Sequence, residues 1–427
     1  MRICVIGAGP CGITAAKSLL DAGLDDLAVF DGGNAIGGGW VFDATPGHSS
    51  VYETAHAISS KAYSQYSDFP MPQSYPDYPG HAELAAYFQA YARHFGVDRF
   101  VRLQTTVQHC ARSADGRWNV ATNAGGRREE HVFDQLVVAN GHHWHPRWPD
   151  YPGAFTGEYL HAHAYKRAAP FAGQRVLVIG GGNSACDIAV EVSRVAASVD
   201  MSWRRGYRII PRYVLGQPAD FFQHASDKLR ALVPQRWLET VQTAVLELVS
   251  GDYAQYGLPR PDHALNATHP TINSQLLPAL REKRIRVRRD VSRFDGDSVH
   301  FVDGEAAHYD VIVACTGYEI RHPFFDTSLV DYSHGAVPLY LRMIHPRLDD
   351  LHFIGLFQPL GCVWPAAELQ ARIMARRLIG AWSPPHDLDA AIADELAHPD
   401  VRQVESPRHT ITVDYPAFRR RLLAQLR

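Results

Sequence analysis

The chain has 427 residues, enough for at least two domains, because single hydrophobic cores stop growing well below that length. Its 46% of hydrophobic residues, 20% of charged residues and formal net charge of -3 are ordinary for a globular protein and indicate neither nucleic acid nor an anionic membrane as a partner. No apolar run of about 18 residues occurs, and the start MRICVIGAG reads as a first strand, so we expect a cytoplasmic protein without a membrane span.

The first third of the chain predicts a βαβ unit, a long loop and a small meander. A strand at residues 2–6, a helix at about 13–22 and a strand at 27–30 follow the hydrophobic periods of these elements. Residues 40–80 show no period and are rich in Pro, Tyr and Ser, which indicates a long ordered loop. Further expected elements are a helix at 84–95, strands at 101–109 and 118–122, and a buried strand at 135–139.

A second βαβ unit is predicted from residue 175. Its strand VLVI leads through a glycine-rich turn into the helix NSACDIAVEVSRVA, and a strand follows at 199–203. The mainly helical stretch up to residue 250 is by default an amphipathic cap, with a lid over a substrate site as the alternative. The remaining expected elements are strands at 286–288, 300–302 and 311–314, a helix at about 366–378, and a basic terminal helix.

None of the six cysteines has C-x-x-C spacing, which argues against a redox-active disulfide and against structural zinc. No cluster of His and Cys at ligand spacing occurs either. We therefore expect free thiols and no metal.

The first glycine-rich turn, residues 7–12 (GAGPCG), has the spacing of a dinucleotide-binding fingerprint. Gly7 permits the tight turn, Gly9 lets the backbone approach a pyrophosphate, and Gly12 lets helix and strand pack closely. Asp31 ends the second strand, 19 residues past Gly12, where a carboxylate can accept hydrogen bonds from a ribose diol.

A second small-residue turn favours FAD over NAD, which the fingerprint alone does not separate. Gly38 and Gly39, in the run GGGW, let backbone approach the flavin side of the ligand, and Trp40 can pack nearby. This run follows an N-terminal fingerprint, so the sequence favours FAD. Pro10 of the first turn is also predicted to lie in the FAD site.

The glycine-rich turn of the second unit, residues 180–185 (GGGNSA), is a G-x-G-x-x-A variant. The strand after it ends not in a carboxylate but in Trp203-Arg204-Arg205. A carboxylate there would repel a 2′-phosphate, whereas a guanidinium binds it bidentately. NADPH rather than NADH is therefore the predicted second nucleotide. The residues predicted to bind it are Gly180, Gly182, Asn183, Ser184, Arg204 and Arg212.

Two such units predict an α/β flavoprotein with two Rossmann-like dinucleotide-binding domains, reduced by NADPH. The strand at 311–314, followed by CTGY, is expected to return the chain to the first domain, so that the NADPH domain is inserted into a discontinuous FAD domain. The expected boundaries are 1–165 and 306–427 for the FAD domain and 166–305 for the NADPH domain, with a helical insertion at about 215–250.

Several stretches carry a family resemblance. FTGEYLHAHAY fits the pattern F-x-G-x-x-x-H-x-x-x-Y through Phe155, Gly157, His161 and Tyr165. The other stretches are ANGHHWHP at 139–146, GGNSACDIA at 181–189, ACTGY at 314–318 and IGLFQPLGCVWPAAELQ at 354–370. In combination they resemble the flavin-containing monooxygenases (class B flavoprotein monooxygenases) of the soluble bacterial type. The resemblance covers nearly the whole chain except the stretch near 215–250.

The resemblance implies a mechanism. NADPH reduces FAD, O₂ adds to the reduced flavin, and a C4a-(hydro)peroxyflavin, protected by NADP⁺, transfers one oxygen atom to N or S of a small organic substrate. Val107 and Gln358 are implied FAD-binding residues. Gly157 is expected to adopt a backbone conformation closed to other residues. His161 and Tyr165 are expected to bond nucleotide or backbone where the two domains meet.

One position departs from the family. Amine- and sulfide-oxidising members carry a Y-x-x-x-x-x-N loop with its Asn beside the oxygen-binding site of the flavin. Residues 50–61, SVYETAHAISSK, have Ile58 at the Asn position, and isoleucine cannot hydrogen-bond a peroxide or a nicotinamide. The candidates for a catalytic role in this loop are Tyr52, His56, Ser59 and Ser60.

The reaction therefore stays open at this point. If another side chain supplies the hydrogen-bond donor in place of the Asn, N- or S-oxygenation remains compatible with the sequence. If the site has no donor, the alternatives are an uncoupled NADPH oxidase and a 2-oxo-acid decarboxylating monooxygenase. Baeyer–Villiger oxidation is a further alternative. Tyr165 argues mildly against it, because the corresponding motif of Baeyer–Villiger enzymes usually ends in Trp. The absence of a C-x-x-C motif from the chain argues against a disulfide oxidoreductase. A nucleotide-binding sensor without turnover is the non-enzymatic alternative. The sequence does not identify the substrate or the oligomeric state. A homodimer is one of the open alternatives.

Overall fold

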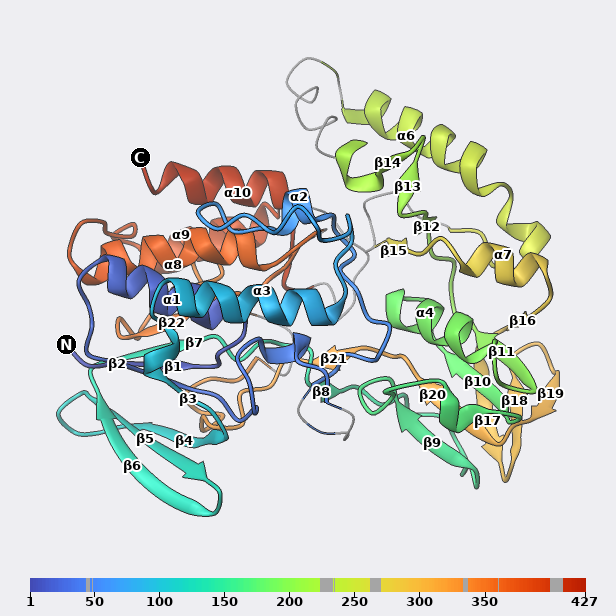
Figure 1. The fold of residues 1–427 in the computed structure, drawn as a ribbon, viewed down its shortest axis with the longest axis horizontal. Coiled ribbons are helices and arrows are strands. Elements are labelled where there is room, and N and C mark those ends of the chain that lie inside the picture. The colour runs from blue at the N-terminus through green and yellow to red at the C-terminus, as the bar shows by residue number, and fades with distance from the viewer. Residues whose placement is uncertain are drawn as a thin grey trace. The chain divides into compact units, whose positions relative to one another are not determined.

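The protein divides into two compact units, each built on its own five-stranded parallel sheet (Figure 1). The computed structural model describes residues 1–43, 47, 49–222, 233, 235–261, 270–332, 337–359, 361–399 and 410–427. Unit 1 comprises Met1–Asp43, Thr54–His145 and Tyr318–Arg427, and unit 2 comprises Ala44–Glu53 and Pro146–Gly317. Two Rossmann-like parallel sheets confirm the predicted fold class.

The parallel sheet of unit 1 has the strand order β22-β7-β1-β2-β3. Its strands are β1 (Ile3–Ile6), β2 (Leu27–Phe30), β3 (Val101–Arg102), β7 (Gln135–Val138) and β22 (Leu351–Phe353). All four residues of β1 are buried, and because side chains alternate along a strand, Ile3 and Val5 face one layer while Cys4 and Ile6 face another. The sheet is therefore the middle layer of three.

Helices form one outer layer and an antiparallel meander forms the other (Figure 1). The helices of unit 1 are α1 (Pro10–Asp21), α2 (Lys61–Ser64), α3 (His81–His94), α8 (Trp364–Leu378), α9 (Leu388–Ala397) and α10 (Tyr415–Ala424), with short 3₁₀ turns η1 (Gly38–Trp40) and η2 (Asp98–Phe100). The meander consists of β4 (Thr105–Arg112), β5 (Trp118–Ala124) and β6 (Arg127–Phe133), and a short pair joins β23 (Gln358–Pro359) to β24 (Thr412–Val413). α1 packs along α8.

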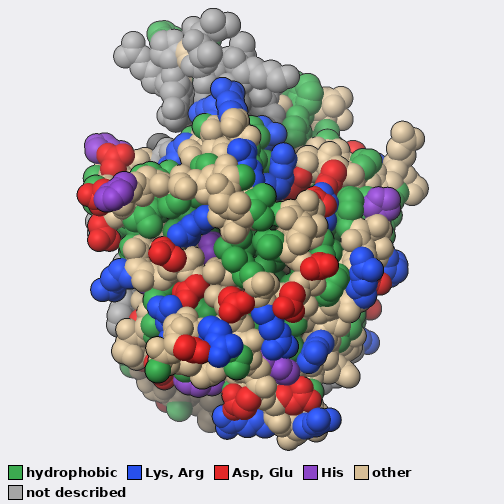
Figure 2. Space-filling model, turned by 90° about the vertical axis from the view of Figure 1, so that its left-hand side faces the viewer, with side chains coloured by type: hydrophobic (Ala, Val, Ile, Leu, Met, Phe, Trp, Pro, Cys, Tyr) green, Lys and Arg blue, Asp and Glu red, His purple; other side chains and the backbone are tan. Residues whose placement is uncertain are grey.

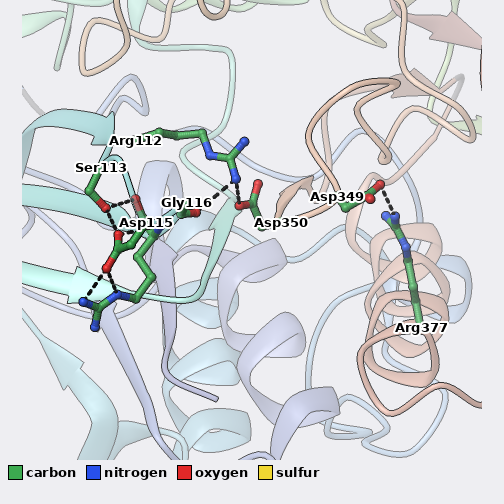
Figure 3. A network of polar contacts seen from close by, with 8 residues as sticks. Arg112, Ser113, Asp115, Gly116, Asp349, Asp350 and Arg377 are labelled. Carbon is green, nitrogen blue, oxygen red and sulfur yellow. Dashed lines mark hydrogen bonds and ion pairs between the residues drawn. The ribbon is translucent and has the colours of Figure 1, made fainter.

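Two ion pairs tie the outer layers of unit 1 to the turn before β22 (Figure 3). Arg112, the last residue of β4, donates to Asp350 over 2.7 Å and to the carbonyl oxygen of Gly116 over 3.0 Å. On the helical side, Arg377 of α8 donates to Asp349 over 3.1 Å. The turn that precedes β22 is thus bound by side chains from both faces of the sheet.

Unit 2 repeats the parallel arrangement with the strand order β16-β11-β10-β20-β9. Its strands are β9 (Glu158–His161), β10 (Arg175–Ile179), β11 (Ser198–Ser202), β16 (Ile285–Arg288) and β20 (Val311–Ala314). Leu177 and Ile179 of β10 pack on an antiparallel meander, while α4 lies against β10 and β11. The other elements are α4 (Asn183–Val192), α6 (Gln235–Ser250), α7 (Leu276–Arg281), η3 (Ala169–Phe171), η4 (Tyr253–Tyr256), β12 (Ile209–Ile210), β13 (Tyr213–Val214), β14 (Gln217–Pro218), β15 (Thr271–Ile272), β17 (Val291–Asp295), β18 (Ser298–Phe301) and β19 (Ala306–His308).

The structure corrects three expectations about the middle of the chain. β20 pairs with β10 and so belongs to the sheet of unit 2, and does not return the chain to the first sheet. The FTGEYLHAHAY stretch, which showed no strand period, contains β9, the edge strand beside β20. Besides Ala44–Glu53, unit 2 comprises Pro146–Gly317 rather than 166–305, and the short strands β8 (His145–Pro146) and β21 (Tyr318–Glu319) stand where the chain passes between units.

The stretch expected to be helical up to residue 250 begins with the hairpin β13–β14 and ends with α6; residues 223–232 and 234 lie outside the described residues. α6 buries Leu246 and Ser250 but exposes Trp237, Val241 and Leu248. Within the described part of the chain, no helix is long and apolar enough to cross a membrane. All six cysteines are free, as expected.

Charges are mixed on the face of the molecule drawn in Figure 2. Acidic and basic side chains are interspersed there and do not gather into a patch of one sign. This distribution agrees with the small formal net charge of -3.

Candidate nucleotide-binding sites

The first glycine-rich turn connects β1 to α1, and two of its glycines are required by close backbone contacts. Gly7 has a φ of +105°, and a Cβ there would lie 2.5 Å from the carbonyl oxygen of Ala139. At Gly12 a Cβ would lie 1.8 Å from the carbonyl oxygen of Gly7. The tight turn and the close packing of helix on strand therefore have the geometry that the fingerprint predicted.

Gly9 and Pro10 shape the start of α1. Gly9 is the N-cap residue and offers no capping side chain, and Pro10 occupies the first turn, where its missing N–H costs nothing. The free N–H groups of this turn, together with the positive end of the helix dipole, suit the pyrophosphate of a dinucleotide. Gly38, with a φ of +56°, packs directly on this turn, since a Cβ there would lie 2.8 Å from Cα of Gly9.

Asp31 lies at the end of β2, as predicted, but its carboxylate already has partners. It is 6% exposed and accepts the N–H of Ala8 over 2.6 Å and the N–H of Gly33 over 2.7 Å. Asp31 therefore holds the first glycine-rich turn in place. Its role toward a ribose hydroxyl stays a prediction.

The other predicted FAD residues occupy different layers of unit 1. Gly39 is exposed, and Trp40 is half-buried with its ring edge-on to Trp364 at the start of α8. Val107 of β4 is buried in the layer below the sheet, and the Gln358 side-chain oxygen lies 3.1 Å from Nε2 of His142.

The carboxyl ends of β7 and β22 add a feature that motif reasoning missed. A small cavity there is lined by Val138, Asn140, Gly141 and Phe353 among others. Within the described residues, Nδ2 of Asn140 is buried without a hydrogen-bond partner. Ligands of parallel sheets bind at this edge, so an unpaired amide donor beside the first glycine-rich turn fits FAD. The run ANGHHWHP was noted only as a family mark, and no local signal showed that its Asn would be buried.

The glycine-rich turn of unit 2 repeats this geometry between β10 and α4. Gly180 has a φ of +131°, and a Cβ there would lie 2.6 Å from the carbonyl oxygen of Cys315. Gly182 is the N-cap of α4 and again offers no capping side chain. Ser184 is half-buried in the first turn of α4, whereas the Asn183 side-chain oxygen accepts the N–H of Ile272 over 2.7 Å and so braces the helix against β15.

The arginines predicted to read the 2′-phosphate follow β11. Arg204 is exposed, and no carboxylate among the described residues pairs with it. Its charge lies near Tyr151: burial and Asp290 raise the pKa of Tyr151, and Arg204 acts in the opposite direction. Arg212 donates its backbone N–H to Oγ of Ser274 over 2.9 Å. A cationic end of β11 fits a 2′-phosphate.

His161 and Tyr165 are buried within unit 2. His161 is 2% exposed, its Nδ1 accepts the N–H of His163 over 3.1 Å, and burial and then His163 lower its pKa to about 4, so its imidazole is neutral at pH 7. Tyr165 is 1% exposed, and burial and then the carboxylate of Glu191 raise its pKa well above the usual range. Their assignment to NADP binding stays a prediction.

The expected reason for Gly157 is wrong. Its φ is not in the left-handed region; instead, a Cβ would lie 2.4 Å from the carbonyl oxygen of Asp310. The glycine is required by the close approach of the chain at the start of β9.

The candidate catalytic residues of the loop at residues 50–61 lie in different environments. Tyr52 is buried and donates to Asp187 of α4 over 2.8 Å, and burial, more than Asp187, raises its pKa. Ile58 is half-buried. Nδ1 of His56 lies 3.1 Å from the carbonyl oxygen of Thr54, and Ser59 and Ser60 are buried. Any catalytic role for these residues stays a prediction.

Two parallel sheets, each with a glycine-rich turn leading into a helix, fit a protein that binds two dinucleotides. Comparison with known proteins identifies the family: the model described as "Flavin-binding monooxygenase-like" matches residues 1–426, and the chain belongs to this family. Flavin-containing monooxygenase 5 of Homo sapiens is 34% identical over 433 residues, which cover 97% of this chain and 80% of the relative. The N-oxide-forming dimethylaniline monooxygenase 2 of Cavia porcellus is 36% identical over 394 residues, which cover 88% of this chain and 72% of the relative.

Solved structures agree with this membership. S-allyl-L-cysteine S-oxygenase from Allium sativum matches with a TM-score of 0.72 and 25% identity, covering 99% of this chain and 88% of that chain. Cyclohexanone monooxygenase matches with a TM-score of 0.73 at 17% identity over 99% of this chain and 97% of that chain, which shows the shared fold. The protein is thus an oxidoreductase of the flavin-containing monooxygenase type, with FAD and NADPH as cofactors.

Proposed function

We propose that this protein uses NADPH and O₂ to transfer one oxygen atom to a nitrogen or sulfur atom of a small organic substrate. The observation that carries the proposal is the pair of glycine-rich turns, at Gly7–Gly12 and Gly180–Gly182, built for two nucleotides in one chain. The names of the relatives support the atom choice, since one forms N-oxides and another is an S-oxygenase.

We assign FAD to unit 1 and NADPH to unit 2. In unit 1 the first turn of α1 would hold the pyrophosphate, Asp31 the ribose, and Asn140 an acceptor atom of the bound ligand. In unit 2 the first turn of α4 would hold the pyrophosphate and Arg204 the 2′-phosphate. When bound, FAD supplies the reducing and oxygen-activating chemistry, and the chain orients the ligands and excludes water.

Ile58 favours a second candidate, an oxygenase that loses part of its oxidising power as H₂O₂. An isoleucine offers no donor where amine- and sulfide-oxidising members carry Asn. The buried hydroxyls of Ser59 and Ser60 are the nearest candidates in sequence for that donor.

A substrate panel tests the proposal. Amines, sulfides, ketones and 2-oxo acids are added to the FAD-loaded protein, and NADPH consumption, oxygenated product and H₂O₂ release are followed together. We expect an amine or sulfide to lower the H₂O₂ released per NADPH and to yield the matching N- or S-oxide. Lactone or ester from ketones would support the Baeyer–Villiger alternative, and stoichiometric H₂O₂ with every compound would support the oxidase.

Ile58→Asn is expected to improve the coupling of NADPH consumption to product. One added hydrogen bond has a net value of about 1 kcal/mol, so H₂O₂ released per NADPH should fall by about two- to tenfold. Ile58→Val is the control, because it keeps the site apolar and should leave this ratio unchanged. An equal ratio in both variants would show that position 58 does not face the oxygen site.

A further inference from the structure

A short excursion of the chain into unit 2 has contacts that the nucleotide sites do not explain. Residues 44–53 belong to unit 2, although the chain before and after them belongs to unit 1. Ser49 is 1% exposed, Tyr52 8% and Val51 9%. Residues 49–52 are therefore packed in the nucleotide unit, even though Ile58 follows them within a few residues.

Lys166 holds the backbone of this excursion. It is 6% exposed, and its Nζ donates to the carbonyl oxygen of Ser49 over 2.6 Å and to that of Val51 over 3.3 Å. In return, the N–H of Glu53 donates to the carbonyl oxygen of Lys166 over 2.8 Å. A buried ammonium is tolerated only where hydrogen bonds replace its water, so Lys166 specifies the position of this segment.

Asp187 holds the side chain of Tyr52 on the nucleotide helix. It lies on α4, four residues after Asn183, and accepts the Tyr52 hydroxyl over 2.8 Å. Its other oxygen accepts the Nδ2–H of Asn273 over 2.6 Å, and Oδ1 of Asn273 in turn accepts the N–H of Leu276, the first residue of α7, over 2.7 Å. One carboxylate thus joins α4, α7 and the excursion.

We propose that Lys166 and Asp187 are positioning residues: they fasten residues 49–53 to α4, and NADP⁺ bound at the N-terminus of α4 tightens this hold. Position 58 follows Glu53 by five residues, at most about 17 Å of extended chain, so fixing Glu53 restricts where Ile58 can lie. The consequence for coupling rests on the proposed function, whereas the fastening involves only this chain and NADP⁺.

Hydrogen–deuterium exchange of the FAD-loaded full chain, with and without NADP⁺, tests the proposal. In the unsubstituted protein we expect NADP⁺ to slow exchange both in peptides covering 49–58 and in peptides covering α4. In Lys166→Met, loss of the charged hydrogen bonds should speed exchange in 49–58 by about tenfold or more, with or without NADP⁺. The protection of α4 by NADP⁺ should remain.

A milder variant and a matched control make the exchange result interpretable. Tyr52→Phe removes only the bond to Asp187 and should speed exchange in 49–58 in the same direction, by severalfold. Lys17→Met removes another hydrogen-bonded lysine, bound to Asp68 over 2.6 Å in unit 1, and should leave residues 49–58 unchanged. Both unit 2 variants should release more H₂O₂ per NADPH and, because the coupling is reciprocal, should bind NADP⁺ less tightly.

Unchanged exchange in 49–58 in Lys166→Met, or no effect of NADP⁺ on this segment in the unsubstituted protein, would overturn the proposal. Uniformly faster exchange along the whole Lys166→Met chain, together with normal exchange in Tyr52→Phe, would assign these residues to folding alone. If no compound is oxygenated by the unsubstituted protein, the proposed function fails, while the exchange result still decides the fastening.

Discussion

Gly12→Ala is expected to remove FAD binding and to destabilise unit 1. The added Cβ would lie 1.8 Å from the carbonyl oxygen of Gly7 and 2.9 Å from its carbonyl carbon. Both atoms belong to the backbone of the tight turn and cannot rotate away as a side chain can. We expect the free energy of unfolding to fall by about 3 kcal/mol or more, since the turn itself must open. Denaturant unfolding and the flavin absorbance of the purified protein measure the two effects.

Gly9→Ala is the control that separates binding from folding. Gly9 has ordinary extended dihedrals, and an added Cβ would meet only Gly38, at 3.5 Å from its Cα. We expect the free energy of unfolding to change by about 1 kcal/mol or less. The Kd for FAD should nevertheless rise by about tenfold or more, or 1.4 kcal/mol, because the methyl group occupies the space that the pyrophosphate needs. Normal FAD affinity in Gly9→Ala would place the ligand elsewhere.

The glycine-rich turns could be predicted because their requirements are local. The contacts of Gly7 and Gly12 arise within one strand–turn–helix unit, so sequence spacing alone specifies them. The flanking β1, α1 and β2 also lie within a few residues of the predicted ranges, since each follows a strong hydrophobic period.

Long-range pairing is what the sequence did not specify. β20 is buried along all four residues, and such a strand fits the middle of either parallel sheet, so its assignment to the first sheet was wrong. β9 was missed because it is an edge strand of four residues, paired on one side only, and its exposure runs from exposed Glu158 to buried His161 with no alternation.

The polar partners of the site residues were equally beyond local reasoning. The bond from Tyr52 to Asp187 joins positions 135 residues apart, and it exists only because residues 49–53 pack in unit 2. For the same reason, Lys166 carried no signal of its burial among the carbonyl groups of Ser49 and Val51. The sequence could identify Ile58 as unusual but could not show what fixes the chain that leads to it.

Arg204→Ala is expected to change the choice of nucleotide. Hydrogen bonds to charged groups contribute about 1.5–3 kcal/mol, so losing the contact with a 2′-phosphate should lower kcat/KM for NADPH by about 10- to 150-fold. NADH lacks that phosphate, so its kcat/KM should stay within about threefold of the original, given that Arg204 is exposed and its loss leaves no buried carboxylate unpaired. Flavin reduction by each nucleotide under anaerobic conditions measures both values without involving oxygen transfer.

Arg284→Ala is the matched control for this prediction. Arg284 is another arginine of unit 2, but its guanidinium is engaged by Glu282 over 2.8 Å and by Oγ of Ser193 over 3.1 Å. Its loss should leave the preference for NADPH over NADH unchanged, which excludes a general effect of removing positive charge. If Arg204→Ala weakens both nucleotides equally, Arg204 does not read the 2′-phosphate, and Arg212→Ala becomes the variant to measure, because it is the other arginine predicted to bind NADPH after β11.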